Sequence, residues 1–78
     1  MKIKLDKFSA VSDFIKLTQS MENDILVKHN KYVVDGKSPM GLYSLDLSKE
    51  LDIEIIPKNP NEVELFVKTL DTLGILVH

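Results

Sequence analysis

The sequence contains no cysteine, no tryptophan and no arginine. The absence of cysteine excludes disulfides, thiolate chemistry and metal sites built on thiolates. The absence of arginine removes the side chain that most often binds phosphates and carboxylates through two parallel hydrogen bonds. A cysteine-free domain is stabilised by its core alone, which agrees with the cytoplasm as the expected location.

Long apolar runs and a surplus of charge are also missing. Ten basic and twelve acidic residues give a formal net charge of −2, and no basic stretch is interleaved with aromatics, so nothing indicates a nucleic-acid partner. Residues Met1–Asp6 lack the apolar run of a signal peptide. No segment approaches the roughly 20 apolar residues that span a bilayer. We therefore expect a soluble, intracellular protein with no nucleic-acid or membrane partner.

The composition that is present is typical of one globular domain. The chain has 78 residues, of which 44% are hydrophobic and 28% charged, and this apolar fraction argues against disorder. A chain of this length forms one domain with a small core. We find no internal repeat, linker or low-complexity segment, and expect a single domain over residues 1–78.

Hydrophobic periodicity predicts the elements of the first half. Alternation over Met1–Leu5 predicts a short strand. Helical spacing then predicts a helix over Ser9–Met21, capped by Ser9 or Asp6, with Val11, Phe14, Ile15 and Thr18 on its buried face. Alternation returns over Asp24–His29 and Tyr32–Val34. The two residues between them, Asn30 and Lys31, predict a hairpin turn, since Asn tolerates positive φ.

The second half begins with a helix start at Ser38-Pro39, where Ser caps the helix and Pro takes its first position. Met40, Leu42, Tyr43 and Leu45 make this a helix of about two turns. A strand over Leu51–Ile56 stops at Pro57. The final helix opens at Asn59-Pro60-Asn61-Glu62, with Asn59 as cap and Glu62 in the capping-box position. Its buried stripe is Val63, Phe66, Val67, Leu70 and Leu73, and Gly74 ends it.

The predicted order is therefore β-α-β-β-α-β-α. Helices on one face of a sheet, with the other face in water, define an open-faced α+β sandwich. We expect a four-stranded antiparallel sheet with three helices on one face.

One stretch resembles a known family. Gly36-Lys37-Ser38-Pro39-Met40-Gly41-Leu42-Tyr43-Ser44-Leu45 is similar to the Lys-Ser-Ile-Met-Gly-(Val/Ile)-Met-Ser-Leu segment of HPr, the phosphocarrier of the bacterial sugar phosphotransferase system. Asp52-Ile53-Glu54-Ile55 resembles the Glu-Ile-Thr-Ile strand that follows it at the same distance. The element order also fits HPr, so the resemblance implies an HPr-like domain, although Pro39 departs from the motif.

The region that carries function in HPr differs here. HPr accepts a phosphoryl group on the His of a Gly-(Leu/Ile)-His-Ala-Arg-Pro-Ala segment before the first helix. Here that region reads Leu5-Asp6-Lys7-Phe8-Ser9-Ala10-Val11, which is shortened and has no His, Arg or Pro. A phosphohistidine needs a nucleophilic imidazole at a helix N-terminus with a cation nearby. Lys7 supplies charge only, because its ammonium is protonated at neutral pH.

No other residues form a pattern that indicates catalysis. His29 lies in a strand and His78 is the last residue, and neither has a carboxylate at a spacing that suggests an orienting partner. A site with two His ligands would lack a third. Asp52 and Glu54 share a strand face, where solvated charges explain them equally well as an acid–base pair. We expect no catalytic residue, no metal site and no cofactor.

Two features suggest binding or regulation. By resemblance, Ser38 lies where a dedicated kinase phosphorylates Gram-positive HPr proteins, although capping alone also accounts for a Ser before Pro. Phe8, Pro39, Met40 and Tyr43 are candidates for an exposed apolar patch, because the family docks its partners on the first helix and this short helix. Some apolar side chains of the short helix, namely Leu42 and Leu45, are instead expected in the core.

Three hypotheses follow. The first is a non-catalytic HPr-like protein that binds other proteins and is switched at Ser38, a combination with a precedent in a catabolite-repression member of the family. The second is a phosphocarrier with a non-standard acceptor. The third is a domain kept for assembly, with no phosphotransferase link. By resemblance, the partners are phosphotransferase-system components, a serine kinase or a transcription regulator, while the sequence does not indicate an oligomeric state.

Overall fold

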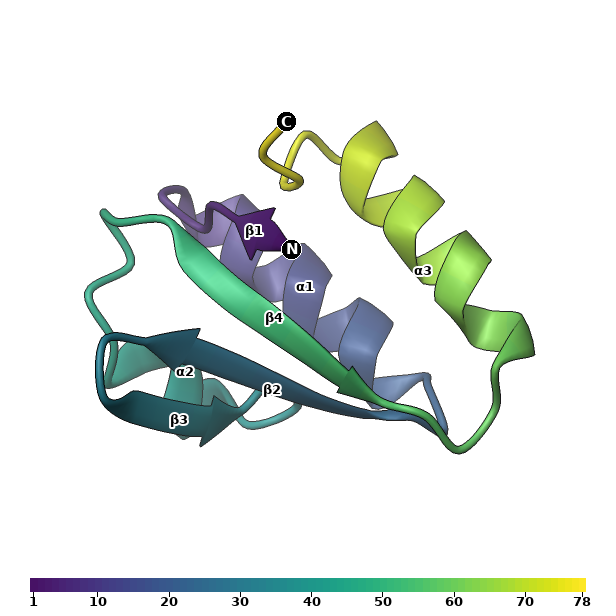
Figure 1. Ribbon diagram of the computed structural model, residues 1–78. Helices are drawn as coiled ribbons and strands as arrows, with labels where there is room; N and C mark the ends of the chain where they lie inside the picture. Colours follow the sequence, from purple (N-terminus) through teal and green to yellow (C-terminus); the bar gives the residue numbers. More distant parts are fainter.

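The computed structural model describes residues 1–78, which form a four-stranded antiparallel sheet with three helices (Figure 1). The strands lie in the order β1-β4-β2-β3. In chain order the elements are β1 (Lys2–Ile3), α1 (Phe8–Gln19), β2 (Asp24–His29), β3 (Tyr32–Asp35), α2 (Pro39–Tyr43), β4 (Leu51–Ile56) and α3 (Asn61–Thr72). The predicted HPr-like α+β fold and its β-α-β-β-α-β-α order are confirmed.

The two faces of the sheet differ because side chains alternate along each strand. Val27 lies opposite Ile53 in the β2–β4 ladder, and both are buried on the face that carries the helices. Their neighbours Lys28 and Asp52 also lie opposite each other, on the face that is left open. The sheet thus presents an apolar surface to the helices and a charged surface to water.

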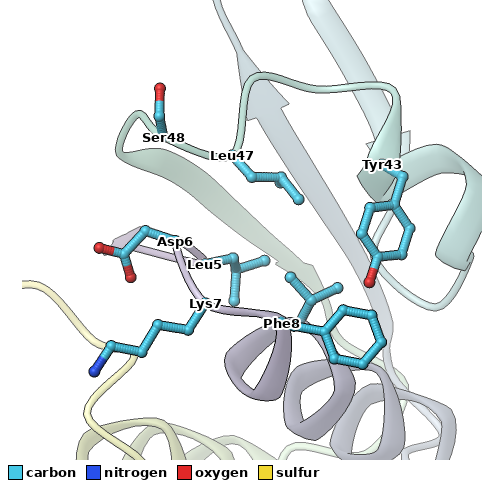
Figure 2. Close-up of a pocket in the computed structure, with 8 residues that line it drawn as sticks. Leu5, Asp6, Lys7, Phe8, Tyr43, Leu47 and Ser48 are labelled. Atoms are coloured by element: carbon cyan, nitrogen blue, oxygen red, sulfur yellow. The ribbon is translucent and has the colours of Figure 1, made fainter.

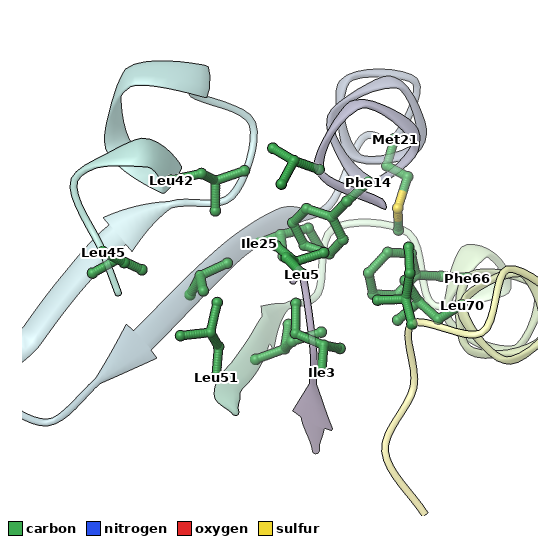
Figure 3. Close-up of a cluster of buried hydrophobic side chains, with 14 residues drawn as sticks. Ile3, Leu5, Phe14, Met21, Ile25, Leu42, Leu45, Leu51, Phe66 and Leu70 are labelled. Carbon is green, nitrogen blue, oxygen red and sulfur yellow. The ribbon is translucent and has the colours of Figure 1, made fainter. Parts of the chain in front are cut away.

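The core lies between the sheet and all three helices (Figure 3). Phe14 of α1 and Phe66 of α3 have ring centroids 6.5 Å apart, and Leu42 is the buried residue of α2. The 14 buried residues are Ile3, Leu5, Val11, Phe14, Met21, Ile25, Val27, Leu42, Leu45, Leu51, Ile53, Phe66, Leu70 and Ile75. They form one cluster, so each helix is held against the sheet by the same core.

β1 is shorter than predicted, since only Lys2 and Ile3 pair with β4. The end of the chain completes this edge. Lys4 N donates to Ile75 O (2.9 Å), Val77 N donates to Lys2 O (3.0 Å), and Leu76 forms a bridge with Ile3. No alternating pattern in residues 75–77 indicates this pairing, because a single bridge is too short to produce one.

The hairpin and the short helix start as predicted. Asn30 adopts φ of 53° in the two-residue turn between β2 and β3. Gly36 is held against β2, since its N–H donates to Ile25 O (2.7 Å) and an added Cβ would meet the Ile25 side chain at 2.9 Å. This close contact excludes any larger residue at position 36.

The predicted cap of α1 is wrong. Lys7 occupies the N-cap position without a side-chain hydrogen bond, Ser9 lies inside the helix, and Asp6 pairs with Lys4 at 3.9 Å. The helix is positioned by its buried residues Val11, Phe14 and Thr18 rather than by a cap. Tertiary packing commonly supplies most of the stability of an amphipathic helix.

α3 follows its predicted stripe except at the end. Phe66 and Leu70 are buried, whereas Leu73 is 41% exposed. Leu73 is the residue that follows the helix, and the chain turns away at Gly74, which has φ of 74°. Pro60, rather than the predicted Asn59, occupies the N-cap position, which has no side-chain hydrogen bond. Asn59 Oδ1 accepts from Asn61 N (3.1 Å) from one residue earlier. No helix combines the length and the apolar composition of a membrane-spanning segment.

Candidate functional site

A groove of about 290 Å³ lies between the N-terminus of α1 and the C-terminal end of α2 (Figure 2). Leu5 and Val11 are buried at its base. Phe8 and Tyr43 both line it, from two elements far apart in the sequence, and Figure 2 shows their rings at the same end of the groove. We call this the Phe8 groove, and its lining is Leu5, Asp6, Lys7, Phe8, Val11, Tyr43, Leu47 and Ser48.

The apolar side chains around this groove are unusually exposed. Phe8 is 80% exposed, Met40 is 86% exposed and Tyr43 is 51% exposed. Pro39 is also exposed, but neither Pro39 nor Met40 lines the groove. The structure therefore brings Phe8 and Tyr43 together and leaves Pro39 and Met40 on the adjoining surface of α2. Leu42 and Leu45 enter the core, as the sequence predicts.

Ser38 lies at the opposite end of α2 from Tyr43. Its Oγ accepts from Gly41 N at 3.2 Å, and the side chain is half-buried at the N-cap position. Lys37, which precedes it, donates its Nζ to Met21 O (2.7 Å) and accepts at its carbonyl from Gln19 Nε2 (3.0 Å). These bonds tie the start of α2 to the end of α1, so Ser38 is held in a fixed position.

The N-terminus of α1 has no imidazole beside it. Lys7 is the N-cap residue, and a second hollow beside it is lined by Lys4, Asp6, Ser9 and Asp13, with Leu73 and Gly74 on its far side. The groups available here are amines, carboxylates and one hydroxyl, none of which is a counterpart of a neutral imidazole nucleophile at neutral pH.

Comparison with known proteins identifies the family. The family model described as the PTS HPr component phosphorylation site matches residues 8–75. This chain belongs to the HPr family. HPr proteins are phosphocarriers rather than enzymes, and they interact with other proteins of the phosphotransferase system. No curated protein and no solved structure matches the chain.

The two histidines of this HPr-family chain lie away from the start of α1. His29 is half-buried at the end of β2, next to the hairpin turn. His78 lies beyond the end of α3, and its Nε2 is 2.6 Å from Oδ1 of Asp71 in the last turn of that helix. Sequence spacing suggested no carboxylate partner for either histidine, and it therefore did not predict the contact of His78 with Asp71. The seven-residue separation crosses a helix end, so no regular spacing could indicate the pair.

The strand carboxylates are paired with lysines. Asp52 Oδ2 accepts from Lys2 Nζ at 2.8 Å, and Glu54 pairs with Lys28. The hydrogen bond from Lys2 lowers the pKa of Asp52 below its ordinary value. Asp52 and Glu54 thus each pair with a lysine on a neighbouring strand, and they do not pair with each other. No three His, Asp or Glu side chains lie close enough together to bind one metal ion.

Asp46 forms a separate polar site beside the Phe8 groove. The hydroxyl of Ser48 donates to Asp46 Oδ1 at 2.6 Å, and Ser48 N donates to the same oxygen at 3.1 Å. These bonds, together with the charges of Lys49 and His29, lower the pKa of Asp46. The turn that carries Leu47 into the groove is therefore held by an ionised carboxylate at neutral pH.

A polar cluster at the other end of the sheet has no counterpart in the sequence predictions. Asn23 is fully buried, its Oδ1 accepts from Lys58 N (2.7 Å) and Asn59 N (2.6 Å), and its Nδ2 donates to Asn59 O (2.9 Å). Glu62 accepts from Glu22 N (3.0 Å) and Asn23 N (3.1 Å). We call these residues the Asn23 cluster. The capping-box role predicted for Glu62 is wrong, because its carboxylate binds another part of the chain.

Proposed function

We propose that this HPr-family chain is non-catalytic and acts by binding other proteins through the Phe8 groove and the adjoining surface of α2. The observation that carries the proposal is at the start of α1. The family places its phosphoryl-accepting histidine there, whereas here Lys7 is followed by an exposed Phe8 facing Tyr43. An apolar surface replaces a nucleophile, which favours binding over phosphoryl transfer.

The physical case rests on apolar area left in water. Burying one large apolar side chain contributes about 1.5–3 kcal/mol. Phe8, Met40 and Tyr43 are each more than half exposed, and aromatic and Met side chains are enriched at the centres of interfaces. Met40 is flexible and adapts to partners of different shape. The expected partners are phosphotransferase-system components, a serine kinase or a transcription regulator in the cytoplasm.

Ser38 is the proposed regulatory residue of this function. Its Oγ already lies over the first turn of α2, accepting from Gly41 N, and a phosphate there would be stabilised by the same N–H groups. Pro39 follows it where the family has Ile, so the kinase that acts on it must accept Pro. α2 is five residues long, and at about 1.5 Å per residue a charge at Ser38 lies about 8 Å from Tyr43. This separation is close to the Debye length at physiological salt, so salt would only partly screen a phosphate at Ser38 from a partner bound at Tyr43.

The test is the intact mass of the chain after incubation with two phosphoryl donors in turn. With ATP and an HPr-type serine kinase, we expect a gain of one phosphoryl group that is absent in Ser38→Ala. With phosphoenolpyruvate and the enzyme that loads HPr proteins, we expect no gain. A gain from phosphoenolpyruvate would overturn the non-catalytic assignment. No gain from ATP would leave Ser38 as a helix cap only.

The second candidate function is a phosphocarrier with a non-standard acceptor. It is favoured by one contact, between His78 Nε2 and Asp71 Oδ1, because a carboxylate on one ring nitrogen leaves the other as a nucleophile. This candidate requires a mass gain from phosphoenolpyruvate that disappears in His78→Ala and persists in His29→Ala. A gain that survives both changes would exclude the imidazoles as acceptors.

A further inference from the structure

The two edges of the sheet are finished differently. Beside β1, residues Ile75–Val77 cover the edge through the bonds of Lys4 N to Ile75 O and Val77 N to Lys2 O. β3 is the other edge, and no further strand pairs with it. An uncovered edge strand presents unpaired backbone groups and is a template for pairing with another chain.

The register shows which backbone groups of β3 point outward. Gly36 N donates to Ile25 O across the β2–β3 ladder. Inward and outward groups alternate along an antiparallel strand, so Val34 and Tyr32 also face β2. The N–H and C=O groups of Val33 and the N–H of Asp35 therefore face away from the sheet. Asp35 O is already used, since it accepts from Ser38 N at 3.0 Å.

The side chains along this edge are self-complementary about Val33. The sequence reads Lys31-Tyr32-Val33-Val34-Asp35, with a cation two residues before Val33 and a carboxylate two residues after it. Neither Lys31 nor Asp35 forms an ion pair within the chain. Tyr32 and Val33 are 59% and 55% exposed. An antiparallel copy centred on Val33 would place each Lys31 opposite an Asp35 of the other chain.

We propose that a second copy of this chain pairs with β3, edge to edge and antiparallel, about a two-fold axis at Val33. Two Val33 N–H groups donate to the two Val33 carbonyls, and the pairing joins two four-stranded sheets into one. Two Lys31–Asp35 pairs flank the axis, and the exposed Val33 side chains meet on the open face. This inference is independent of the proposed function, because it uses none of the residues of the Phe8 groove.

Sedimentation velocity over a concentration series up to about 1 mM tests the pairing, because a contact this small gives a weak dimer. We expect the native chain to shift from monomer to dimer. Val33→Pro removes the outward N–H without removing a bond to β2, and is expected to weaken the dimer at least about tenfold. A chain that stays monomeric at the highest concentration overturns the proposal.

Charge reversal provides the sharper test. Lys31→Glu places two carboxylates opposite each other at both ends of the contact, and Asp35→Lys places two ammonium groups there, so each variant alone is expected to dimerise about tenfold more weakly. Mixing the two variants restores both opposite-charge pairs and is expected to restore association. Lys49→Glu makes the same charge change on an exposed loop and is expected to leave the dimer unchanged.

The outcomes separate this contact from others. Asp35 Oδ1 also accepts from Lys37 N (2.9 Å), so folding of Asp35→Lys is checked by circular dichroism. If that variant is unfolded, Val33→Pro and Lys31→Glu still decide the matter. Dimerisation that neither variant weakens, or a mixture that does not restore association when both variants are folded, overturns pairing through β3.

Discussion

The two ends of the sheet use polar and apolar side chains in opposite ways. At one end, where the β4–α3 loop meets the α1–β2 turn, the Asn23 cluster buries a carboxamide and satisfies each of its hydrogen-bonding groups. At the other end, the Phe8 groove exposes aromatic side chains to water. The first arrangement stabilises the fold. The second adds little to stability and leaves apolar area available for a partner.

This difference follows from two unequal free-energy costs, that of burying a polar group without a partner and that of leaving an apolar side chain exposed. A buried polar group without a partner costs about 1–3 kcal/mol, whereas an exposed apolar side chain forgoes burial without creating an unsatisfied group. Substitutions at the Asn23 end should therefore reduce the free energy of unfolding, and substitutions at the groove should not.

Asn23→Ala is expected to lower the free energy of unfolding by about 3 kcal/mol. The change leaves Lys58 N, Asn59 N and Asn59 O without their partner inside the protein. Urea unfolding measures the loss. Asn61→Ala, at an exposed position in α3, is the matched control and is expected to change stability by less than about 0.5 kcal/mol. Equal losses in the two variants would contradict a special role for Asn23.

Glu62→Gln is expected to lower the free energy of unfolding by about 1–2 kcal/mol. The amide loses the charge and one of the two oxygens that accept from Glu22 N, and it retains one oxygen for Glu22 N and Asn23 N. The control is Glu64→Gln, whose carboxylate is exposed and pairs with Lys68 at 3.2 Å. A Glu62→Gln protein as stable as this control would show that the carboxylate does not hold the two turns together.

Ser38→Ala is expected to cost about 1 kcal/mol, because Gly41 N loses its acceptor. For a domain of this size that loss lowers the melting temperature by about 4–8 °C. Ser38→Asn keeps an acceptor at the cap and is expected to restore most of the difference. Thermal unfolding followed by circular dichroism separates the two, and identical melting of both variants would rule out capping as the source of the effect.

The exposed Lys2–Asp52 pair is expected to give a small pH dependence. The hydrogen bond to Asp52 raises the pKa of Lys2 above 10.5, and the hydrogen bond from Lys2 lowers that of Asp52 below 3.8. The contribution of Asp52 to the free energy of unfolding is complete above pH 3.8. It disappears as the pH falls through the lower pKa of the folded state. The contribution of Lys2 is complete below pH 10.5. It disappears as the pH rises through the higher pKa of the folded state.

Asp52→Asn should therefore flatten the acid side of the stability curve. Urea unfolding at about pH 5 and about pH 3 measures the slope. Because both groups are in contact with solvent, salt should reduce the difference between the native chain and the variant. A slope that Asp52→Asn leaves unchanged, at low salt, would assign the acid sensitivity to other carboxylates.

Phe8→Ala is expected to change the free energy of unfolding by less than about 0.5 kcal/mol, because Phe8 is 80% exposed. Phe14→Ala removes the same side chain from the core and is expected to cost about 3–5 kcal/mol. Urea unfolding of both variants compares an exposed and a buried Phe on one helix. A large loss in Phe8→Ala would mean that the groove is part of the core rather than a binding surface.

Local signals predicted most of the fold. Alternation identified β2 and β4, the Asn30 turn predicted β3 as the hairpin partner of β2, and Ser38-Pro39 marked the start of α2. The same rules were wrong where a side chain had a choice of partners. Glu62 satisfies the capping-box spacing, yet its carboxylate binds Glu22 N and Asn23 N. The α1–β2 turn offers these two N–H groups, whereas Asn59 N at the helix start is already bonded to Asn23 Oδ1.

The candidate site was predicted in part. The exposure of Phe8, Pro39, Met40 and Tyr43 agrees with the predicted apolar patch, but only Phe8 and Tyr43 line one groove. Their partner-binding role and the regulatory role of Ser38 remain predictions. The sequence analysis missed the Asn23 cluster and the His78–Asp71 contact. Each joins positions that no helical or strand periodicity relates.

The sequence by itself determined the order of elements, the apolar face of each one, the cap of α2 and the lack of a histidine before α1. Each of these depends on neighbours along the chain. Only the tertiary structure decided which polar groups share partners across the fold, which apolar side chains stay in water, and which sheet edge is covered by residues Ile75–Val77. These outcomes depend on distances between residues that are remote in sequence, and chain packing alone sets such distances.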